Sequence, residues 1–281
     1  MQKIKNTLIQ GKHNKPILTD VYFQKNKQQK PLVIFCHGYK GFKDWGVFDL
    51  MAKEFVKNDV ALVKFNFSHN GGTVDQPIDF PDLEAFGQNN FTKEQDDLQS
   101  VIDWLFEQPE LKEEINFQDI SLIGHSRGGG AVILKASQEA RIRRLITWAS
   151  VSDYKVRFPS GPVLAHWKKE GVAYIENSRT NQQMPHYIQF YNDFVINEEK
   201  LTIKIAAEKL NIPHLIVHGT ADATVPLLEA ENLRDWSSHS ELFLVPNGDH
   251  GFGAKQPWIE AELPLDFKTV LEKTFQFIKN T

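Results

Sequence analysis

The chain has a single cysteine, Cys36, among its 281 residues. No disulfide can form within the chain, so the fold does not require an oxidising compartment. Cys36 ends an apolar run, and the sequence indicates no electropositive pocket around it. This favours a buried structural thiol over a catalytic one.

Long apolar segments are also missing. No apolar run reaches the roughly 20 residues that a helix needs to cross a bilayer. The first residues, MQKIKNTLIQ, lack the uninterrupted apolar stretch of a signal peptide. We therefore expect a cytoplasmic protein that makes no membrane contact.

An excess of positive charge is absent as well. The formal net charge is −4, which excludes the basic footprint of a nucleic-acid-binding protein. Lysines do gather near the N-terminus, where we expect them to line a solvated sheet edge and protect it from aggregation. They are Lys3, Lys5, Lys12, Lys15, Lys25, Lys27 and Lys30.

Short apolar runs recur along the rest of the chain. Most of them are continuously apolar rather than alternating, which is typical of strands covered on both faces of a parallel sheet. The six runs are 31–36, 60–67, 119–124, 144–150, 213–219 and 241–246.

Helical patterns lie between these runs. Leu98, Val101 and Leu105 have the spacing of one face of an amphipathic helix. Strand and helix in alternation predict an α/β fold, with a mostly parallel sheet and helices on both of its faces. Two N-terminal runs, 2–10 and 17–24, mix polar and apolar residues and predict an antiparallel edge to the same sheet.

The alternation is interrupted once, over residues 151–210. These residues contain no strong strand pattern, and a simple crossover between strands needs far fewer residues. We therefore predict a single domain, residues 1–281, with a helical cap inserted at about 151–210.

The segment Gly124-His125-Ser126-Arg127-Gly128 fits the pattern G-x-S-x-G. It follows an apolar run and precedes a predicted helix, which is the setting of a nucleophile elbow. A tight turn from strand to helix strains the backbone of its central residue and needs small neighbours. The hydroxyl of this serine should project at the carboxyl end of the sheet, near the amides of a helix N-terminus.

A serine nucleophile needs a general base, and the base needs a carboxylate that orients it. Two loops, HGTADATVP (218–226) and VPNGDHGFG (245–253), each follow a predicted strand and reach the same edge of a parallel sheet. We predict Asp222 as the acid and His250 as the base. Asp249 is an alternative acid, although it would have to fold back onto the ring of its neighbour.

The segment HGYKGFKDWG, residues 37–46, follows the first of the six apolar runs. Its three glycines let the backbone approach a substrate closely. We expect the backbone amides of Tyr39 and Arg127 to form an oxyanion hole, which is a pair of N–H groups aimed at the charge of a tetrahedral intermediate.

No motif indicates a metal or a nucleotide. His214 and His218 are four residues apart, but in a strand this spacing separates them by about 13 Å, too far for one zinc ion. The glycines of SHNGGTVDQ, residues 68–76, do not form a phosphate-loop pattern. We expect neither a metal nor a cofactor.

The segments HGY, GHSRG, GTAD and GDHG together resemble the α/β-hydrolase superfamily, and within it the dienelactone hydrolases and the prolyl-oligopeptidase-like and feruloyl-esterase-like enzymes. The resemblance covers about 31–150 and 211–280. It implies an eight-stranded, mostly parallel sheet and a triad of the serine, aspartate and histidine named above, which would act through an acyl-enzyme intermediate.

The inserted cap lies where several such enzymes carry a lid. Four residues are candidate substrate contacts. His37 and His125 belong to the two loops beside the nucleophile, and His166 and Trp167 belong to the cap.

We therefore expect an enzyme that cleaves a small or medium carboxylic ester. An acyl-peptidase or aminopeptidase, a lactone hydrolase and a thioester hydrolase are alternatives within the class. A small-molecule receptor built on the same fold is an alternative outside it. The sequence specifies neither the natural ester nor the oligomeric state, and a homodimer stays open.

Overall fold

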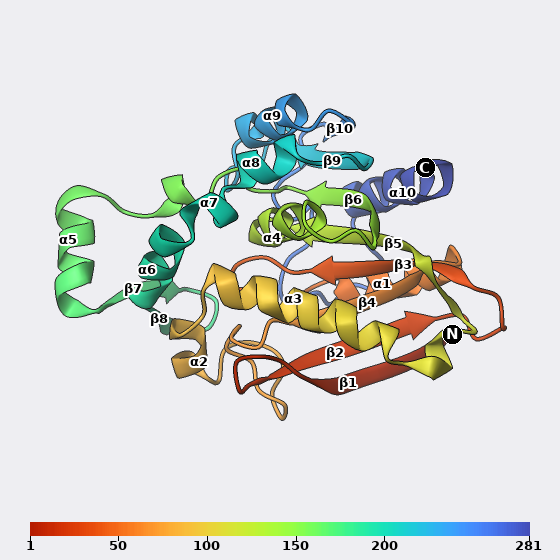
Figure 1. Ribbon diagram of the computed structural model, residues 1–281, viewed down its shortest axis with the longest axis horizontal. Coiled ribbons are helices and arrows are strands. Elements are labelled where there is room, and N and C mark those ends of the chain that lie inside the picture. Colours follow the sequence, from red (N-terminus) through yellow and green to blue (C-terminus); the bar gives the residue numbers. More distant parts are fainter.

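The computed structural model describes residues 1–281. Eight strands form one sheet in the order β1-β2-β4-β3-β5-β6-β9-β10 (Figure 1). The pairs β1–β2 and β2–β4 are antiparallel, and all other neighbours are parallel. The strands are β1 (Gln2–Gln10), β2 (Pro16–Phe23), β3 (Lys30–Cys36), β4 (Ala61–Asn66), β5 (Ile115–His125), β6 (Ile142–Trp148), β9 (His214–Gly219) and β10 (Ser240–Val245).

All six apolar runs are strands of this sheet, and the two N-terminal runs form its antiparallel edge, as the sequence predicts. Strand β3 shows why these runs are continuously apolar. Leu32, Ile34 and Cys36 pack into the core on one face, whereas Val33 and Phe35 pack into the core on the other. Because both faces are covered, a polar residue at almost any position of the strand would be buried.

Helices cover both faces of the sheet (Figure 1). On one face lie α3 (Phe91–Phe106) and α4 (Arg127–Ala136), and Leu98 and Val132 from these helices join the larger core. On the other face lie α1 (Phe48–Lys57) and α10 (Leu265–Asn280). The predicted mostly parallel α/β sheet with helices on both faces is confirmed.

The insertion between β6 and β9 differs in part from the prediction. It contains helices, but it also contains an antiparallel hairpin that the sequence pattern does not indicate. Its elements are η2 (Lys155–Arg157), α5 (Gly161–Glu170), β7 (Val172–Asn177), β8 (Gln182–Tyr187), α6 (Gln189–Ile196), α7 (Glu198–Leu201) and α8 (Ile203–Glu208). Helices α5 and α6 and the hairpin project from one end of the sheet (Figure 1).

The two strands of the hairpin form because of tertiary packing rather than because of the intrinsic strand preference of their residues. The sequence of β8, QQMPHY, has no β-branched residue and contains a proline, so its intrinsic strand preference is weak. Met184 is nevertheless fully buried against Phe42, Phe80 and Phe86 of the body. This tertiary contact decides the conformation of the segment.

The remaining elements are α2 (Leu83–Gly87), η1 (Pro109–Leu111) and α9 (Leu227–Trp236). Helix α9 packs on the sheet, where Ala230 and Leu233 join the larger core. No helix in the chain combines the length and apolarity that crossing a membrane would need. Cys36 is buried, as expected for a structural thiol.

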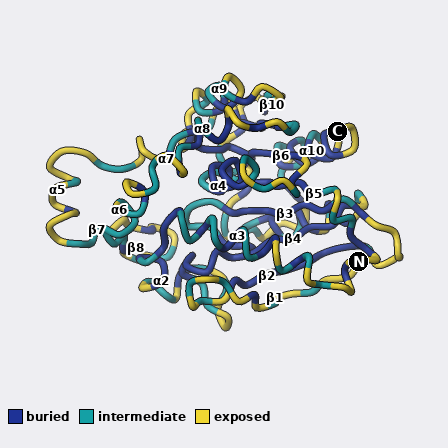
Figure 2. Tube along the Cα trace, viewed as in Figure 1, coloured by how far each residue is buried: buried dark blue, intermediate teal, exposed yellow.

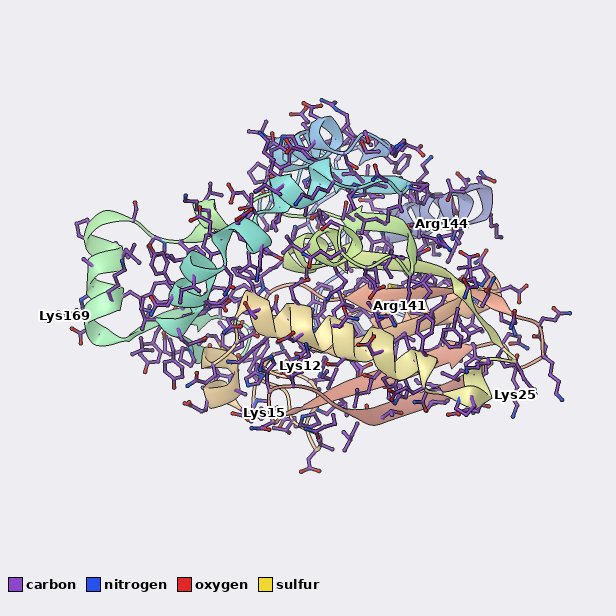
Figure 3. All side chains as sticks on the ribbon, viewed as in Figure 1. Lys12, Lys15, Lys25, Arg141, Arg144 and Lys169 are labelled. Atoms are coloured by element: carbon purple, nitrogen blue, oxygen red, sulfur yellow. The ribbon has the colours of Figure 1, made fainter.

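The N-terminal lysines do not all lie on a solvated edge. Lys12 and Lys15 pair with Asp96 and Asp82, at 2.8 Å and 2.5 Å. Lys25 lies at one end of the molecule, away from Lys12 and Lys15 (Figure 3). Lys30 is buried, and its ammonium group is 2.9 Å from the carboxylate of Glu114. The expectation of a solvated edge is therefore wrong for Lys30, because a buried acid offsets its charge.

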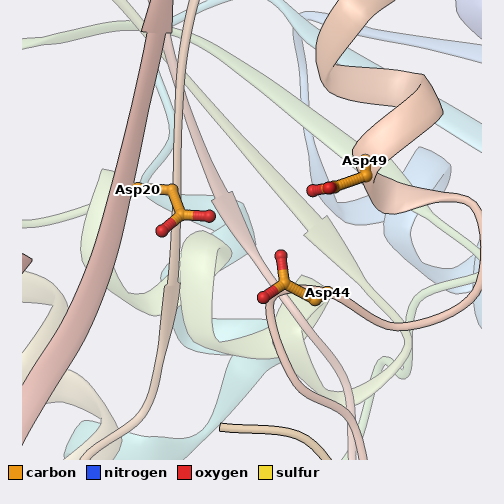
Figure 4. Close-up of side chains that lie close together, drawn as sticks. All are labelled: Asp20, Asp44 and Asp49. Carbon is orange, nitrogen blue, oxygen red and sulfur yellow. The ribbon is translucent and has the colours of Figure 1, made fainter. Parts of the chain in front are cut away.

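Three carboxylates, Asp20, Asp44 and Asp49, gather where β2 meets the start of α1 (Figure 4). Two fully buried lysines lie among them. Lys43 is 3.0 Å from Asp20, and Lys64 is 2.6 Å from Asp44. Burial would raise the pKa of Asp44, but the two ammonium charges outweigh it and lower the pKa. The cluster is an ion-pair network that fixes the loop after β3 against the sheet.

Candidate active site

Ser126 occupies a sharp turn between β5 and α4. Its φ of 57° and ψ of −122° are a conformation that residues other than glycine rarely adopt. Its amide donates to the carbonyl of Trp148 at 2.9 Å, and its carbonyl accepts from the amide of Gly129 at 3.0 Å. These bonds fix the strained backbone and leave the side chain free to point away from the sheet.

The two glycines of the motif are required by close backbone contacts. A Cβ atom on Gly124 would lie 2.2 Å from the carbonyl oxygen of Gly128. A Cβ atom on Gly128 would lie 2.5 Å from the carbonyl oxygens of both Cys36 and His37. No flexible side chain could move to relieve either clash, so the turn tolerates no larger residue at these positions.

The structure brings the hydroxyl, the imidazole and the carboxylate predicted from the sequence into one chain of hydrogen bonds. His250 Nε2 lies 3.0 Å from Ser126 Oγ. His250 Nδ1 lies 2.8 Å from Asp222 Oδ2. The three residues come from the loops after β5, β9 and β10, whose carboxyl ends meet at the same rim of the sheet.

Asp222 is held tightly from its own loop. Its side chain is fully buried, and its Oδ1 accepts from the amides of Thr224 and Val225, each at 2.8 Å. Burial would raise the pKa of Asp222, but the hydrogen bond from His250 and those two amides outweigh burial and lower it. The group is therefore a carboxylate at neutral pH.

The alternative acid, Asp249, has a different environment. Its Oδ1 accepts from the amides of Gly251 at 3.0 Å and Gly253 at 2.8 Å. The carboxylate thus closes the loop that carries His250 instead of contacting the imidazole. Of the two acids considered from the sequence, only Asp222 touches the ring.

His125 supports the loop of His250 from the neighbouring strand. Its Nε2 lies 2.9 Å from the carbonyl oxygen of His250, and the two ring centroids are 4.9 Å apart. Burial, and then the charge of His250, lower the pKa of His125 to about 3. His125 is therefore neutral and donates one hydrogen bond that positions its neighbour.

The loop after β3 lies directly against Ser126. A Cβ atom on Gly38 would lie 2.9 Å from the Cβ atom of Ser126, so only glycine permits this approach. The amide of Tyr39 follows at once and has no acceptor within the protein. The amide of Arg127 is the first of helix α4, where N–H groups lack intrahelical partners. Both predicted amides therefore belong to segments that flank the hydroxyl.

His37 is part of the same loop and is not free to act as a base. Its Nδ1 is 2.9 Å from the carbonyl oxygen of Gly38, and its Nε2 accepts from the amide of Phe67 at 3.4 Å. Burial lowers the pKa of His37 to about 4. The ring is thus a neutral brace for the loop.

One histidine of the cap, which the sequence does not single out, contacts the loop after β3. His186 of β8 accepts a hydrogen bond at Nε2 from the hydroxyl of Tyr39, at 2.9 Å. Its Nδ1 donates to the carbonyl of Met184 at 3.2 Å, which fixes this tautomer. Burial, and then the charge of Arg127, lower the pKa of His186 to about 4. No motif surrounds this residue, so only the fold could identify it.

A cavity of about 350 Å³ opens at Ser126. Its walls include His37 and His125 from the four residues expected to contact substrate. The other two lie elsewhere. His166 is exposed on α5, and Trp167 is buried in the cap, where its indole donates to the carbonyl of His186 at 2.7 Å. The expectation of a wall made by His166 and Trp167 fails, because the cap approaches the site with β8 rather than with α5.

A larger open groove, of about 720 Å³, runs between α1 and α10. It shares no lining residue with the cavity at Ser126, and it contains neither a nucleophile nor a histidine. The groove therefore lacks the hydroxyl and imidazole groups that meet at Ser126.

Comparison with protein-family models found no match. Among curated proteins, the serine hydrolase BPHL of Mus musculus is 27% identical over 150 residues, which are 50% of this chain and 52% of that protein. An uncharacterized protein of Escherichia coli, of 31.7 kDa, is 28% identical over 130 residues, which are 44% of this chain. The matched regions of these two relatives span 52% and 38% of their own lengths.

Solved structures match nearly the whole chain. Est1E from Butyrivibrio proteoclasticus, with ferulic acid bound, has a TM-score of 0.72 and 17% identity, and covers 97% of this chain and 98% of its own. The α/β hydrolase GrgF from Penicillium sp. sh18 has a TM-score of 0.70 and 15% identity over 99% of this chain and 98% of its own. A dienelactone hydrolase from Anabaena variabilis has a TM-score of 0.64 and 14% identity over 99% and 97%.

These similarities agree with the topology and with the sequence resemblance. The sheet order, the strand-to-helix turn at Ser126 and the flanking helices are those of one known architecture. The chain has the α/β-hydrolase fold.

Proposed function

We propose that this protein is a serine hydrolase that cleaves a small or medium carboxylic ester through an acyl-enzyme intermediate. The observation that carries the proposal is the chain of two hydrogen bonds, 3.0 Å and 2.8 Å long, from Ser126 through His250 to Asp222. A hydroxyl, an imidazole and a buried carboxylate in this order form the arrangement that activates a serine for attack.

In the first half of the reaction, Ser126 Oγ attacks the ester carbonyl carbon while its proton passes to His250 Nε2. Asp222 accepts the hydrogen bond from Nδ1–H throughout and stabilises the imidazolium that forms. The tetrahedral intermediate collapses when the bond to the alcohol oxygen breaks. His250 returns the proton to that oxygen, and an acyl group remains on Ser126.

In the second half, water takes the place of the alcohol. His250 removes a proton from the water as its oxygen attacks the acyl carbon, and a second tetrahedral intermediate forms. Its collapse releases the carboxylic acid and returns the proton to Ser126 Oγ. The backbone amides of Tyr39 and Arg127 donate to the oxyanion of both intermediates.

The comparisons support an ester as the substrate. Est1E is described with ferulic acid bound, and several other solved structures with this fold are described as esterases or dienelactone hydrolases. The cavity volume of about 350 Å³ suits a small molecule. We assign residues 1–281 to one catalytic domain, in which 151–210 form a cap over the site, and we assign no cofactor to the reaction.

The test is hydrolysis of 4-nitrophenyl acetate, butyrate and octanoate by the wild type and by Ser126→Ala. We expect turnover by the variant to be slower by on the order of 10⁴-fold to 10⁶-fold, because removing the nucleophile leaves only oxyanion stabilisation and binding. Ser100→Ala, which changes a serine on α3 away from the cavity, is the matched control and should keep full activity.

Three further measurements separate the alternatives. A fluorophosphonate should label Ser126 in the wild type, as read by mass spectrometry of the modified peptide. Faster cleavage of an aminoacyl-nitroanilide than of any ester would replace the esterase assignment by a peptidase. Binding of esters without repeated turnover would indicate a receptor.

A further inference from the structure

The walls of the cavity at Ser126 carry charge of one sign. Three cationic residues line it, Lys40, Arg179 and Lys255, and no aspartate or glutamate does. The chain as a whole has a net charge of −4, so the cavity has the opposite sign from the molecule. The histidines His37 and His125 add nothing to this charge, because burial keeps both neutral at pH 7.

Lys40 lies in the loop that carries the Tyr39 amide, and no carboxylate offsets its charge. Its ammonium group is 5.4 Å from the centroid of the Tyr39 ring. Burial lowers the pKa of Lys40, and the nearby charge of Arg179 lowers it further, with no opposing contribution from an acid. The backbone of Lys40 also has a φ of 52°, in the left-handed region where glycine or asparagine would be less strained.

Arg179 comes from a different segment, the turn between β7 and β8 of the cap. Its only ionic partner is Asp79, with 2.6 Å between Nη1 and Oδ1, but the pair lacks hydrogen-bond geometry and Asp79 Oδ1 has no hydrogen-bond partner. Most of the five guanidinium N–H groups are therefore left for another acceptor.

Lys255 comes from the loop after β10, five residues beyond His250, and its side chain is exposed. The three cations thus reach one cavity from the loop after β3, the cap hairpin and the histidine loop. Asp79 offsets part of the charge of Arg179, but no carboxylate pairs with Lys40 or Lys255, so the cavity keeps a positive potential that favours an anion.

We propose that the ester cleaved by this protein carries a carboxylate, and that Lys40, Arg179 and Lys255 bind that group. The inference rests on the proposed function, because it names the substrate class of the same cavity. Arg179 can hold a carboxylate through two parallel N–H groups, whereas the lysines act as point charges that draw the anion in.

The experiment compares esters that differ only in this charge. The first pair is 4-nitrophenyl hydrogen adipate and 4-nitrophenyl methyl adipate, in which the second carboxyl group of the acid half is a free carboxylate or a methyl ester. The second pair is 4-carboxyphenyl butyrate and 4-carbamoylphenyl butyrate, in which the alcohol half is charged or neutral. Each kcat/KM is divided by the rate of hydroxide-catalysed hydrolysis of the same ester, which removes differences in intrinsic reactivity.

We expect the wild type to prefer the anionic member of at least one pair by about tenfold at low ionic strength. The preference should shrink at about 1 M salt, where the Debye length falls to about 3 Å. Lys40→Met and Arg179→Met should each lower kcat/KM for the anionic ester by about tenfold, mainly through KM, and leave the uncharged ester within about twofold.

Lys25→Met is the matched control, because it removes one positive charge at the far end of the molecule (Figure 3). This variant should leave kcat/KM unchanged for both the anionic and the uncharged ester. Fluorophosphonate labelling of Ser126 in every variant verifies that the site is still formed, so a misfolded variant is recognised and replaced by Lys40→Gln or Arg179→Gln.

The outcomes distinguish this inference from the proposed function. If uncharged esters are cleaved in a Ser126-dependent way but neither pair shows an anionic preference, the substrate class is wrong and the hydrolase stands. Equal losses for charged and uncharged esters in Lys40→Met would also overturn the anion site. If Ser126→Ala retains activity, the proposed function fails and this inference fails with it.

Discussion

The body of the protein and its cap are built in different ways. In the body, strand β3 buries six of its seven residues, whereas helix α5 of the cap buries only Trp167 among ten. Figure 2 shows the same contrast, with buried segments across the sheet and exposed segments over α5 and β7. The sheet can therefore hold the side chains of the proposed triad rigidly, while α5 and β7 of the cap bury few side chains.

The β8 side of the cap meets the loop after β3 that carries Tyr39. Trp167 and Tyr39 both bond to His186, and Met184 packs against Phe42. Since the cap supplies none of the three side chains of the proposed triad, changes in the body should act on the chemical step and on stability. Changes in the cap should act on substrate binding. Four predictions test this division, from the largest effect to the smallest.

The first prediction concerns the two acids of the body. Asp222→Asn should slow turnover by about 10⁴-fold, because the amide can no longer hold the imidazole in the required tautomer. Asp249→Asn is the matched control and should cost much less, since that carboxylate bonds to the amides of Gly251 and Gly253. Steady-state kinetics on 4-nitrophenyl butyrate measure both. A larger loss for Asp249→Asn would reverse the assignment of the acid.

The second prediction compares two glycines. Gly128→Ala should destabilise the protein by about 3 kcal/mol, because the new Cβ atom would meet two backbone carbonyls at 2.5 Å. Gly171→Ala in the cap meets nothing within 4 Å and faces only the strain of a φ of 75°, about 1 kcal/mol. Urea unfolding measures both free energies. Equal costs would contradict the picture of a tightly packed body and a loosely packed cap.

The third prediction concerns pH and a buried acid of the body. Burial raises the pKa of Asp97 to about 7. The folded protein therefore holds this proton up to about pH 7, whereas the unfolded chain loses it near pH 4. The free energy of unfolding should fall as the pH rises from 4 to 7.

Asp97→Asn isolates this contribution. Asn can still accept from the amide of Ser68, which lies 2.7 Å from the carboxylate, and its NH₂ group would replace Oδ1, which has no partner. The variant should have a Tm about 2–4 °C above that of the wild type at pH 8 and a smaller difference at pH 5. Parallel curves of Tm against pH for the two proteins, from pH 4 to pH 8, would show that Asp97 does not cause the pH dependence of stability.

The fourth and smallest effect is at the contact between the body and the cap. Tyr39→Phe removes the hydroxyl that bonds to His186 and keeps the ring and the backbone amide. We expect KM to rise a few-fold, turnover to stay within about twofold, and stability to fall by about 1 kcal/mol, the contribution of one hydrogen bond. Turnover slowed by about two orders of magnitude would show that the cap contributes to the chemical step and would break the division between the two regions.

Much of the body could be predicted because its signals are local. The continuous apolar runs follow from burial on both faces, and the glycines beside Ser126 follow from the tight turn. The loops of Asp222 and His250 follow from the rule that parallel strands end on one rim. The prediction of a solvated position for Lys30 is wrong because its buried partner, Glu114, is 84 residues away in the sequence.

The cap could not be predicted in the same way. Its hairpin has weak strand preference, and the burial of Met184 by the body decides its conformation. The sequence suggests His166 and Trp167 as neighbours of the site, yet His186 is the residue that reaches Tyr39. Nothing in the segment QQMPHY distinguishes this histidine from a surface one.

The sequence by itself determined the α/β alternation, the strained turn at Ser126 and the order in which the three candidate groups appear along the chain. These depend on hydrophobic periodicity and backbone sterics, which act over a few residues. The tertiary structure alone decided which acid touches His250, where the cap meets the loop after β3 and which cations share the cavity. Those relations join residues far apart in the chain, and only the packing of the whole fold brings them within a few ångströms of one another.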